Sequence, residues 1–285
     1  MKTTFLILFG LCLCVSTLAA GPLQEARINR IINDVSVLDP AKGAHKAALQ
    51  EVIKNEIGVK TGIKSRSELL FQDETLTRLG PDSYFSFKPG TRDMALEKGT
   101  MLLQVPKGLG GAKIHTAAVT ASITGTTIML EHVPGKLLKV LVLEGSLRMS
   151  VNGTFGDSLL LLPGKMVIMN PHDKHIPEPV SVDLKKIVQT SSLVRMSKEN
   201  GTGVITASVP SMDLIQHEID LQGKEKNGHQ LVDTNLIIPG GGSNVVMAGD
   251  DLDEQIEKRH NVGTPILLAS NPTSTPVPVL FPPSV

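Results

Sequence analysis

The chain has 285 residues, and its 28 lysines and arginines balance 28 aspartates and glutamates, so the formal charge at pH 7 is zero. This balance offers no basic field to nucleic acid or anionic lipid, and we expect neither as a partner. Aromatic residues make up only 3% of the chain. Their scarcity counts against sugar-binding and single-strand-binding surfaces, which depend on exposed aromatic rings.

Residues 1–20 have the pattern of a cleavable signal peptide. Lys2 supplies the positive start, residues 5–15 are apolar and uncharged, and residues 16–20 are small enough for cleavage. The apolar run is about half of the ~20 residues that a membrane-spanning helix needs. Cleavage is therefore favoured over a retained anchor, which stays the alternative. No second apolar run of membrane length follows, so we expect no membrane span after cleavage.

Cys12 and Cys14, the two cysteines of the chain, both lie within this segment. The processed protein would hold no thiol, which excludes disulfides, thiolate metal ligands and a cysteine nucleophile. An exported protein without disulfides fits a bacterial envelope better than a small eukaryotic secreted domain. We expect the protein in the periplasm, outside the cell or at the surface of a bacterium.

Residues 21–57 are predicted to be a helical lead-in. Ile28, Ile31, Ile32 and Val35 recur at the spacing of one helix face, and a second helix is expected between Asp39-Pro40 and Gly58.

From residue 58 to about residue 170 the apolar period changes to two, which predicts a β domain. Ser67–Phe71 and Thr75–Leu79 flank a polar turn and predict a hairpin. Val140–Leu143 is apolar on both faces, which is typical of a central strand. Leu159–Met169 predicts a second hairpin, around Pro163-Gly164.

These strands predict an antiparallel sheet folded on itself, with sandwich and solenoid both open. Residues 171–262 form a mixed region of uncertain structure, in which Met212–Ile219 predicts a helix and Val182–Arg195 either a helix or a strand. Thr234–Ile238 predicts a buried strand that runs into a glycine loop. Residues 263–285 are rich in proline, and we expect a disordered tail there.

Candidate sites are few, and the sequence predicts no catalytic, cofactor-binding or metal-binding residue. His172 and His175, with Asp173, lack a nearby third strong ligand and stand among prolines, so a solvated loop is favoured over zinc. Asp250–Glu254 lacks the spacing of a calcium loop. Neither Gly110-Gly111 nor Gly240–Gly242 has a phosphate-loop pattern, and no Gly-x-Ser-x-Gly elbow is present. We expect a protein that is not an enzyme and needs no cofactor.

Several motifs between Gly58 and Val151 resemble the FecR domain of bacterial iron-transport regulators. The motifs are Val59-Lys-Thr-Gly62, Lys64-Ser-Arg-Ser-Glu-Leu69, Leu79-Gly-Pro81, Leu96-Glu-Lys-Gly-Thr-Met-Leu-Leu-Gln-Val105, Thr116 with Gly125-Thr126, and Val140-Leu-Val-Leu-Glu-Gly145. In this chain Glu74 replaces the glycine usual in the first turn. The resemblance implies a twisted, solenoid-like β module. Regulators of this kind carry a cytoplasmic anti-sigma segment and a transmembrane helix before the domain. Here a signal peptide stands in their place, so control of a sigma factor is not carried over.

The leading hypothesis is an exported, non-enzymatic FecR-domain protein that acts through protein contacts in the bacterial envelope, in signalling or structure. Addition of a partner strand to a sheet edge is a mode that fits it. The alternative is a cupin-like binder of a small ligand or polysaccharide, since Leu141–Met169 resembles half of such a barrel without its His-x-His motif. The identity of the envelope partner and homo-oligomerisation are left open.

Overall fold

The computed structural model describes residues 21–54, 57–154, 156–200, 203–207 and 209–225, and these hold nineteen strands and two helices. The mainly β class expected from the sequence is confirmed. Within the described residues, no helix has the length and apolar character needed to cross a membrane. The predicted tail at residues 263–285 and the strand at Thr234–Ile238 lie outside the described part of the chain.

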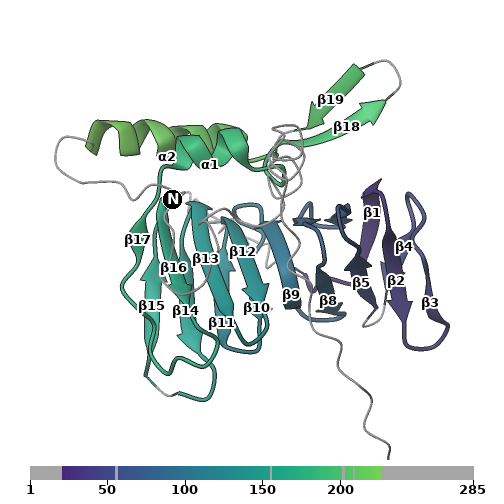
Figure 1. Ribbon diagram of the computed structural model, residues 1–285, viewed down its shortest axis with the longest axis horizontal. Coiled ribbons are helices and arrows are strands. Elements are labelled where there is room, and N and C mark those ends of the chain that lie inside the picture. The colour runs from purple at the N-terminus through teal and green to yellow at the C-terminus, as the bar shows by residue number, and fades with distance from the viewer. Residues whose placement is uncertain (1–20, 55–56, 155, 201–202, 208, 226–285) are drawn as a thin grey trace, which may run out of the picture.

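Seventeen of the strands form two layers that share one strand, β9 (Asp93–Gln104). We call them the inner sheet and the outer sheet (Figure 1). The inner sheet has the order β4 (Val52–Lys54), β1 (Glu25–Ile32), β6 (Arg66–Phe71), β7 (Leu76–Leu79), β9, β12 (Thr127–Val133), β13 (Leu137–Glu144), β16 (Lys165–Met169) and β17 (Val180–Ser181). The outer sheet has the order β3 (Gly43–Lys46), β2 (Val35–Asp39), β5 (Gly58–Thr61), β8 (Tyr84–Lys88), β9, β10 (Gly111–His115), β11 (Val119–Thr124), β14 (Leu147–Val151) and β15 (Ser158–Leu161).

The main hydrophobic core lies between the two sheets. Alternate residues of each strand point into it, as Ile28 and Leu69 do from the inner sheet and Val37 and Val59 from the outer one. The rings of Phe71 and Phe87, one from each sheet, meet edge to face with centroids 5.0 Å apart. All pairings except β9 with β10 are antiparallel. The apolar side chains between the two sheets hold the layers face to face, as in a β-sandwich.

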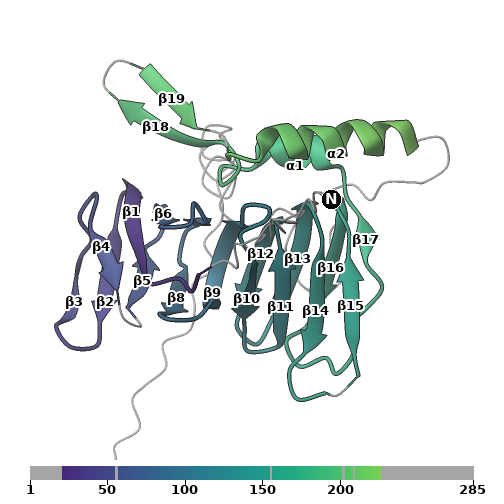
Figure 2. The same ribbon diagram turned by 180° about the vertical axis from the view of Figure 1, so that it is seen from behind.

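Two helices cover the other face of the inner sheet over its later strands, near β13, β16 and β17 (Figures 1 and 2). They are α1 (Leu184–Thr190), capped by the Asp183 side chain, and α2 (Met212–Glu225). Their apolar residues meet those of the sheet in a second core, which includes Met129, Met166 and Ile215. β13 serves both cores and lies between β12 and β16, which confirms the central strand predicted at Val140–Leu143.

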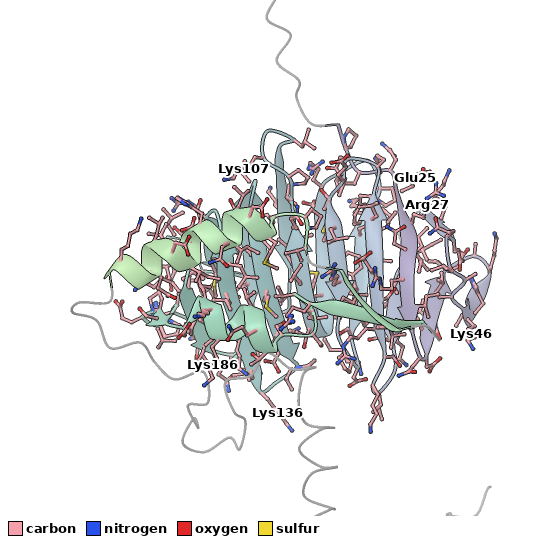
Figure 3. All side chains as sticks on the ribbon, turned by 90° about the horizontal axis from the view of Figure 1, so that it is seen from above. Glu25, Arg27, Lys46, Lys107, Lys136 and Lys186 are labelled. Atoms are coloured by element: carbon pink, nitrogen blue, oxygen red, sulfur yellow. The ribbon has the colours of Figure 1, made fainter. Side chains whose placement is uncertain are left out.

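Beyond α1, the two-stranded hairpin of β18 (Met196–Asn200) and β19 (Gly203–Ala207) extends toward the first strands of the inner sheet (Figure 3). Arg30 on β1 donates to the Met196 carbonyl at 3.2 Å. The chain after α1 is held more firmly by Arg78 on β7. Its Nη1 donates to the Leu193 and Val194 carbonyls at 2.8 and 2.9 Å.

Arg78 is itself buried and paired. Its Nε donates to Glu68 at 2.8 Å from the opposite position of the neighbouring strand. Burial lowers the pKa of the Arg78 guanidinium, and the Glu68 carboxylate opposes that shift. A buried charge pair of this kind is costly to break, because removal of one partner leaves the other charge without compensation. Because Arg78 also binds the Leu193 and Val194 carbonyls, the pair specifies where the segment after α1 crosses the helix-covered face of the inner sheet.

The helical lead-in predicted for residues 21–57 is wrong. The segment forms β1 to β4, which belong to the same two sheets as the later strands. A bulge in β1 between Ile28 and Arg30 explains the error. It resets the alternation, so that Ile28 and Ile31 both face the core with the spacing of three residues that a helix face also has.

The hairpin predicted for Leu159–Met169 is also wrong, although both of its strands exist. β15 pairs with β14 in the outer sheet, whereas β16 pairs with β13 in the inner sheet. The turn at Pro163-Gly164 is therefore a crossing between layers. By contrast, the hairpin of β6 and β7 and the helix beginning at Met212 are confirmed. The division into domains at the expected boundaries stays a prediction.

β9 crosses from the outer to the inner sheet at Gly99. Its first half pairs with β8 and its second half with β7 and β12. Gly99 has φ +94°, and a Cβ added there would overlap the Cα and Oγ of Ser83. Only glycine satisfies both conditions, which gives a structural reason for the glycine of the Leu-x-x-Gly motif.

We predict that Gly99→Ala lowers the free energy of unfolding by about 3 kcal/mol or more, because backbone strain and a clash act at one residue. Urea denaturation of the purified protein measures the effect. Gly90→Ala is the matched control, since Gly90 has φ +75° but open space where its Cβ would stand, and it should cost only about 1 kcal/mol. Equal decreases in the free energy of unfolding of the two variants would show that the clash with Ser83 adds no cost, and would contradict the prediction.

We predict the opposite sign for Glu74→Gly in the turn between β6 and β7. Glu74 has φ +64°, a conformation that glycine adopts without steric cost, so the substitution should raise the free energy of unfolding by about 0.5–1 kcal/mol. Glu97→Gly, at an exposed strand position of β9, is the control and should be destabilising. A loss of stability in Glu74→Gly would contradict the prediction.

Candidate interaction edge

The histidine loop singled out in the sequence does not form a joint site. His175 contacts Asp157 at 3.1 Å, whereas His172 contacts the Asn170 side chain at 3.0 Å. Asp173 accepts from the Asn170 backbone N–H at 2.8 Å and so closes a turn. Across the described residues, no group of three His, Cys, Asp or Glu side chains is placed to hold a metal ion.

The other sequence candidates give no site in the described part of the chain. Gly110 and Gly111 lead into β10, in a strand rather than at the start of a helix. Asp250–Glu254 and Gly240–Gly242 lie outside the described residues.

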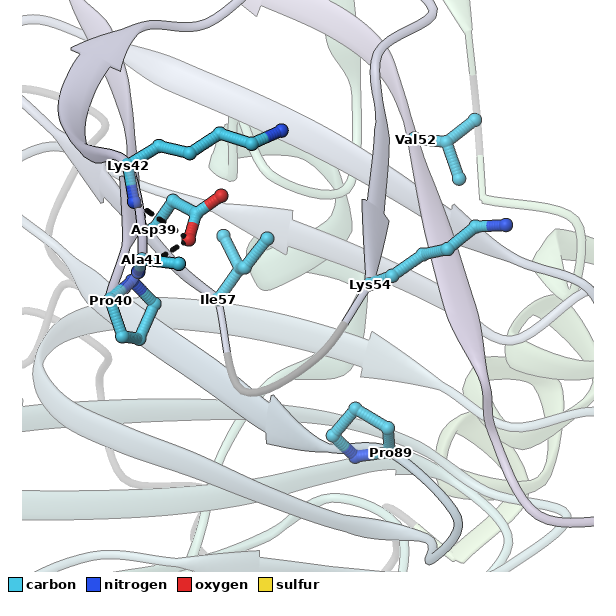
Figure 4. A pocket seen from close by; sticks show the side chains of 8 residues that line it. All are labelled: Asp39, Pro40, Ala41, Lys42, Val52, Lys54, Ile57 and Pro89. Atoms are coloured by element: carbon cyan, nitrogen blue, oxygen red, sulfur yellow. Dashed lines mark hydrogen bonds between the residues drawn. The ribbon is translucent and has the colours of Figure 1, made fainter.

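An open groove of about 690 Å³ lies at the end of the sandwich formed by the first strands (Figure 4). It separates the turn between β2 and β3 from strand β4. Its lining residues are Asp39, Pro40, Ala41, Lys42, Val52, Lys54, Ile57 and Pro89. The Asp39 carboxylate accepts from the backbone N–H groups of Ala41 and Lys42, which assigns it to the turn. These eight residues offer apolar contacts and lysine charge, but no pairing of a nucleophile with a base.

A cluster of ionisable groups lies where α2 packs on β13. Buried Glu144 pairs with Lys107 at 2.7 Å. Burial, and then the charge of Glu144, raise the pKa of Glu218 on α2, while His217 and Lys107 act in the opposite direction. The ionised form of Glu218 therefore opposes the packing of α2, and its protonated form favours it.

The edges of the two sheets offer another kind of site. An exposed edge strand presents unpaired backbone groups, and proteins protect such edges with charges, prolines or very short strands. Three of the four edges here are protected. β3 carries His45 and Lys46, β4 has three residues and carries Lys54, and β17 has two residues that follow Pro177 and Pro179.

The fourth edge, β15, has no charged side chain within the strand, although it is as short as β3 and has Asp157 and Pro163 close to its two ends. Its sequence Ser158-Leu-Leu-Leu161 is uncharged, and its partner among the described strands is β14. Leu160 is 49% exposed and Leu162, just beyond the strand, is 51% exposed. The position opposite Leu160 on β14 is Arg148, so the leucines stand at the border of a polar surface. We call Ser158–Leu162 the leucine edge.

Sequence reasoning missed the leucine edge because the predicted hairpin of Leu159–Met169 paired these leucines with the strand after Pro163-Gly164. A signal was present, since four consecutive leucines in a strand with one buried face must put alternate residues outside. Leu161 is buried as this alternation requires, and Leu160 and Leu162 are its exposed neighbours.

Comparison with protein families decides what the central part of the chain is. Residues 58–148 match the family described as FecR protein. The chain contains a FecR domain. The match begins at β5 and ends within β14, so the leucine edge and both helices lie outside the part of the FecR domain that the family describes. No protein of curated function matches the chain.

Two solved structures are similar to parts of the chain, and both are described as a "putative anti-sigma factor" from Parabacteroides distasonis ATCC 8503. The first, at 1.65 Å resolution, is 14% identical with a TM-score of 0.41, and the match covers 46% of this chain and 62% of that one. The second, at 2.50 Å, is 11% identical with a TM-score of 0.38 and covers 59% and 91%. Our chain thus spans under two thirds of the first, and nothing about function follows from either likeness.

We predict that Glu218→Gln slows hydrogen exchange of the α2 amides a few-fold at neutral pH, because it removes the charge that opposes packing. In the unsubstituted protein the favourable contribution of Glu218 is complete below pH 4.5, its ordinary pKa, and is lost as the pH rises through the raised pKa of the folded protein. The difference between the two proteins should therefore vanish at acid pH. Asp213→Gln, in the first turn of α2, is the control and should not slow exchange. A difference that persists unchanged in acid would contradict the prediction.

Proposed function

We propose that this protein is an exported, non-enzymatic binding protein of the bacterial envelope, which binds a partner protein by adding one of the partner's strands to the leucine edge. The observation that carries the proposal is the exposure of Leu160 on an uncharged edge strand and of Leu162 just beyond it. Backbone groups of such an edge supply affinity, and the pockets between alternate side chains supply specificity.

The composition of the chain supports the compartment in this proposal. Residues 1–20 have the pattern of a signal peptide, and both cysteines fall within it. The FecR domain supports a role in envelope signalling or structure. The cupin-like alternative fits less well, because β13 and β16 lie in the inner sheet and β14 and β15 in the outer sheet, as two stacked layers rather than one closed barrel.

The other end of the sandwich fits a partner strand less well. His45 on β3 forms a hydrogen bond with Glu51 at 2.8 Å, which raises the pKa of His45. Lys54 on β4 pairs with Glu25 at 2.8 Å. A strand added there would have to displace or accommodate these charged pairs. The leucine edge has one such contact at its start, that of Asp157 with His175, but no charged side chain within the strand, and burial of its two leucines favours association.

We predict that Leu160→Lys combined with Leu162→Lys reduces capture of the partner at least about tenfold, since two charges on the edge oppose strand addition and less apolar surface is buried. The measurement is crosslinking mass spectrometry on intact cells that express the full-length chain at native level. Crosslinks should lead from Lys165, the lysine that follows the leucine edge, to one dominant envelope protein in the unsubstituted chain only.

Leu49→Lys is the matched control, because Leu49 is 54% exposed at the opposite end of the sandwich. It should leave capture unchanged. Capture of the same envelope protein by the doubly substituted chain at an undiminished level would exclude the leucine edge as the binding site.

A further inference from the structure

β15 stands at the end of the sandwich and directs a definite set of backbone groups away from it (Figures 1 and 2). The Val151 N–H on β14 donates to the Asp157 carbonyl at 3.4 Å, and the register of β14 with β15 continues from this pair. Alternate residues of an antiparallel strand direct their N–H and C=O groups to the same neighbour. Every second residue from position 157 therefore faces β14, and the residues between them face outward. These outward-facing residues are Ser158, Leu160 and Leu162.

Neighbouring hydrogen bonds agree with this direction. The Asn152 N–H, one residue after Val151, donates to the Ala118 carbonyl on the opposite side of β14 at 2.9 Å, as the alternation requires. Only one of the outward groups is already engaged in a turn, since the Leu162 carbonyl accepts from the Lys165 N–H at 3.1 Å. Leu162 thus keeps its N–H for an incoming strand.

The leucine edge is complementary to a second copy of itself. An antiparallel copy related by a two-fold axis at Leu160 places Leu160 opposite Leu160, and Ser158 of each copy opposite Leu162 of the other. All of these residues face outward, so the register joins free backbone groups to free backbone groups. The two Leu160 residues exchange a pair of hydrogen bonds, and each Leu162 N–H donates to a Ser158 carbonyl.

We propose that a second copy of the protein occupies the leucine edge in the absence of another partner, by antiparallel pairing of the two β15 strands about an axis at Leu160. The outer sheet then continues from one copy into the next, with its core-facing side unchanged. The proposal rests on the proposed function in one respect, because both require β15 to accept a strand. An envelope partner that binds at the edge must displace the second copy.

The side chains and charges around the edge favour this pairing. The exposed Leu160 of each copy packs against its counterpart, which buries apolar surface at the axis. Arg148 lies opposite Leu160 on β14. The two Arg148 residues of a dimer are three strand spacings apart, about 14 Å, which exceeds the Debye length of ~10 Å at 0.1 M salt. Asp157 of each copy lies opposite Pro163 of the other, so like charges do not meet.

The geometry also limits the size and strength of the assembly. A two-fold interface uses the same patch on both copies, so the pairing closes at a dimer and leaves no leucine edge for a third copy. The edge has only four strand residues. Small interfaces of this kind are weak and transient. The dimer should therefore depend on concentration and yield to a partner that offers a better strand.

A cysteine scan tests the predicted axis in the full-length chain. Cys12→Ser and Cys14→Ser remove both native cysteines. Ser158→Cys, Leu160→Cys and Leu162→Cys are then introduced singly, and each protein is oxidised at high protein concentration. Residues of a hydrogen-bonded pair have Cα atoms about 5.5 Å apart, within the range that a disulfide spans. Positions 158 and 162 each lie four residues, about 14 Å, from their own counterparts. Leu160→Cys should therefore give several-fold more disulfide-linked dimer than the other two.

Leu49→Cys, at the opposite end of the sandwich and 54% exposed, is the control for random collisions. It should give little covalent dimer. A yield from Leu160→Cys no greater than that from Leu49→Cys would overturn the proposal. A maximum at position 158 or 162 would overturn the axis at Leu160.

Sedimentation equilibrium measures the same association without an introduced thiol. The unsubstituted protein should show a dimer whose share rises with concentration. Leu160→Lys should lower the association constant at least about tenfold, because it places two positive charges at the axis, whereas Leu49→Lys should leave it unchanged. An unsubstituted protein that stays monomeric at every concentration would overturn the proposal.

These measurements separate the dimer from the proposed function. If the unsubstituted protein stays monomeric while capture of the envelope partner is lost on substitution of Leu160 and Leu162, the present proposal fails alone. If the dimer forms with its maximum at Leu160→Cys while capture is undiminished in the doubly substituted chain, the proposed function fails alone.

Discussion

The arrangement of both sheets depends on the close approach of Gly99 to Ser83. β9 passes from the outer to the inner sheet at this point, and the left-handed backbone of Gly99 leaves no room for a side chain. The Ser83 hydroxyl accepts from the Thr100 N–H at 2.9 Å and contacts the Thr100 carbonyl at 3.1 Å. Thr61 on β5 donates to the nearby Gly80 carbonyl at 2.6 Å. The buried hydrogen bonds of Ser83 with Thr100 therefore fix the point at which β9 passes from the outer sheet to the inner sheet.

The inner sheet is buried on both faces over the part that the helices cover, and this explains its composition. β13 carries apolar residues on consecutive positions because each side meets a different core. Two buried ion pairs lie on the helix-covered face of the inner sheet, each between neighbouring strands. They are Lys139 with Glu131, 2.9 Å apart, and Arg78 with Glu68. Their partners are fixed by the register, so the ion pairs and the pairing of the strands specify each other.

Two stacked open sheets necessarily have four edges, and the protein treats them unequally. Lysine, histidine, proline and short length protect three, whereas leucines occupy the fourth. An unprotected edge invites aggregation unless a strand covers it.

Local chemistry alone determined much of this protein. The FecR motifs, the hairpin of β6 and β7 around its polar turn, the central position of Val140–Leu143 and the helix from Met212 were all predictable, because turn residues and apolar periods act over a few neighbouring positions. Tertiary structure decided the rest. The bulge in β1 gave strand residues a helical spacing, and only pairing with β6 shows their true state. The partners of β15 and β16 lie in different sheets, a choice made by residues distant in the chain. The same choice exposes Leu160 and Leu162, since the burial of a strand residue depends on which neighbours arrive from elsewhere.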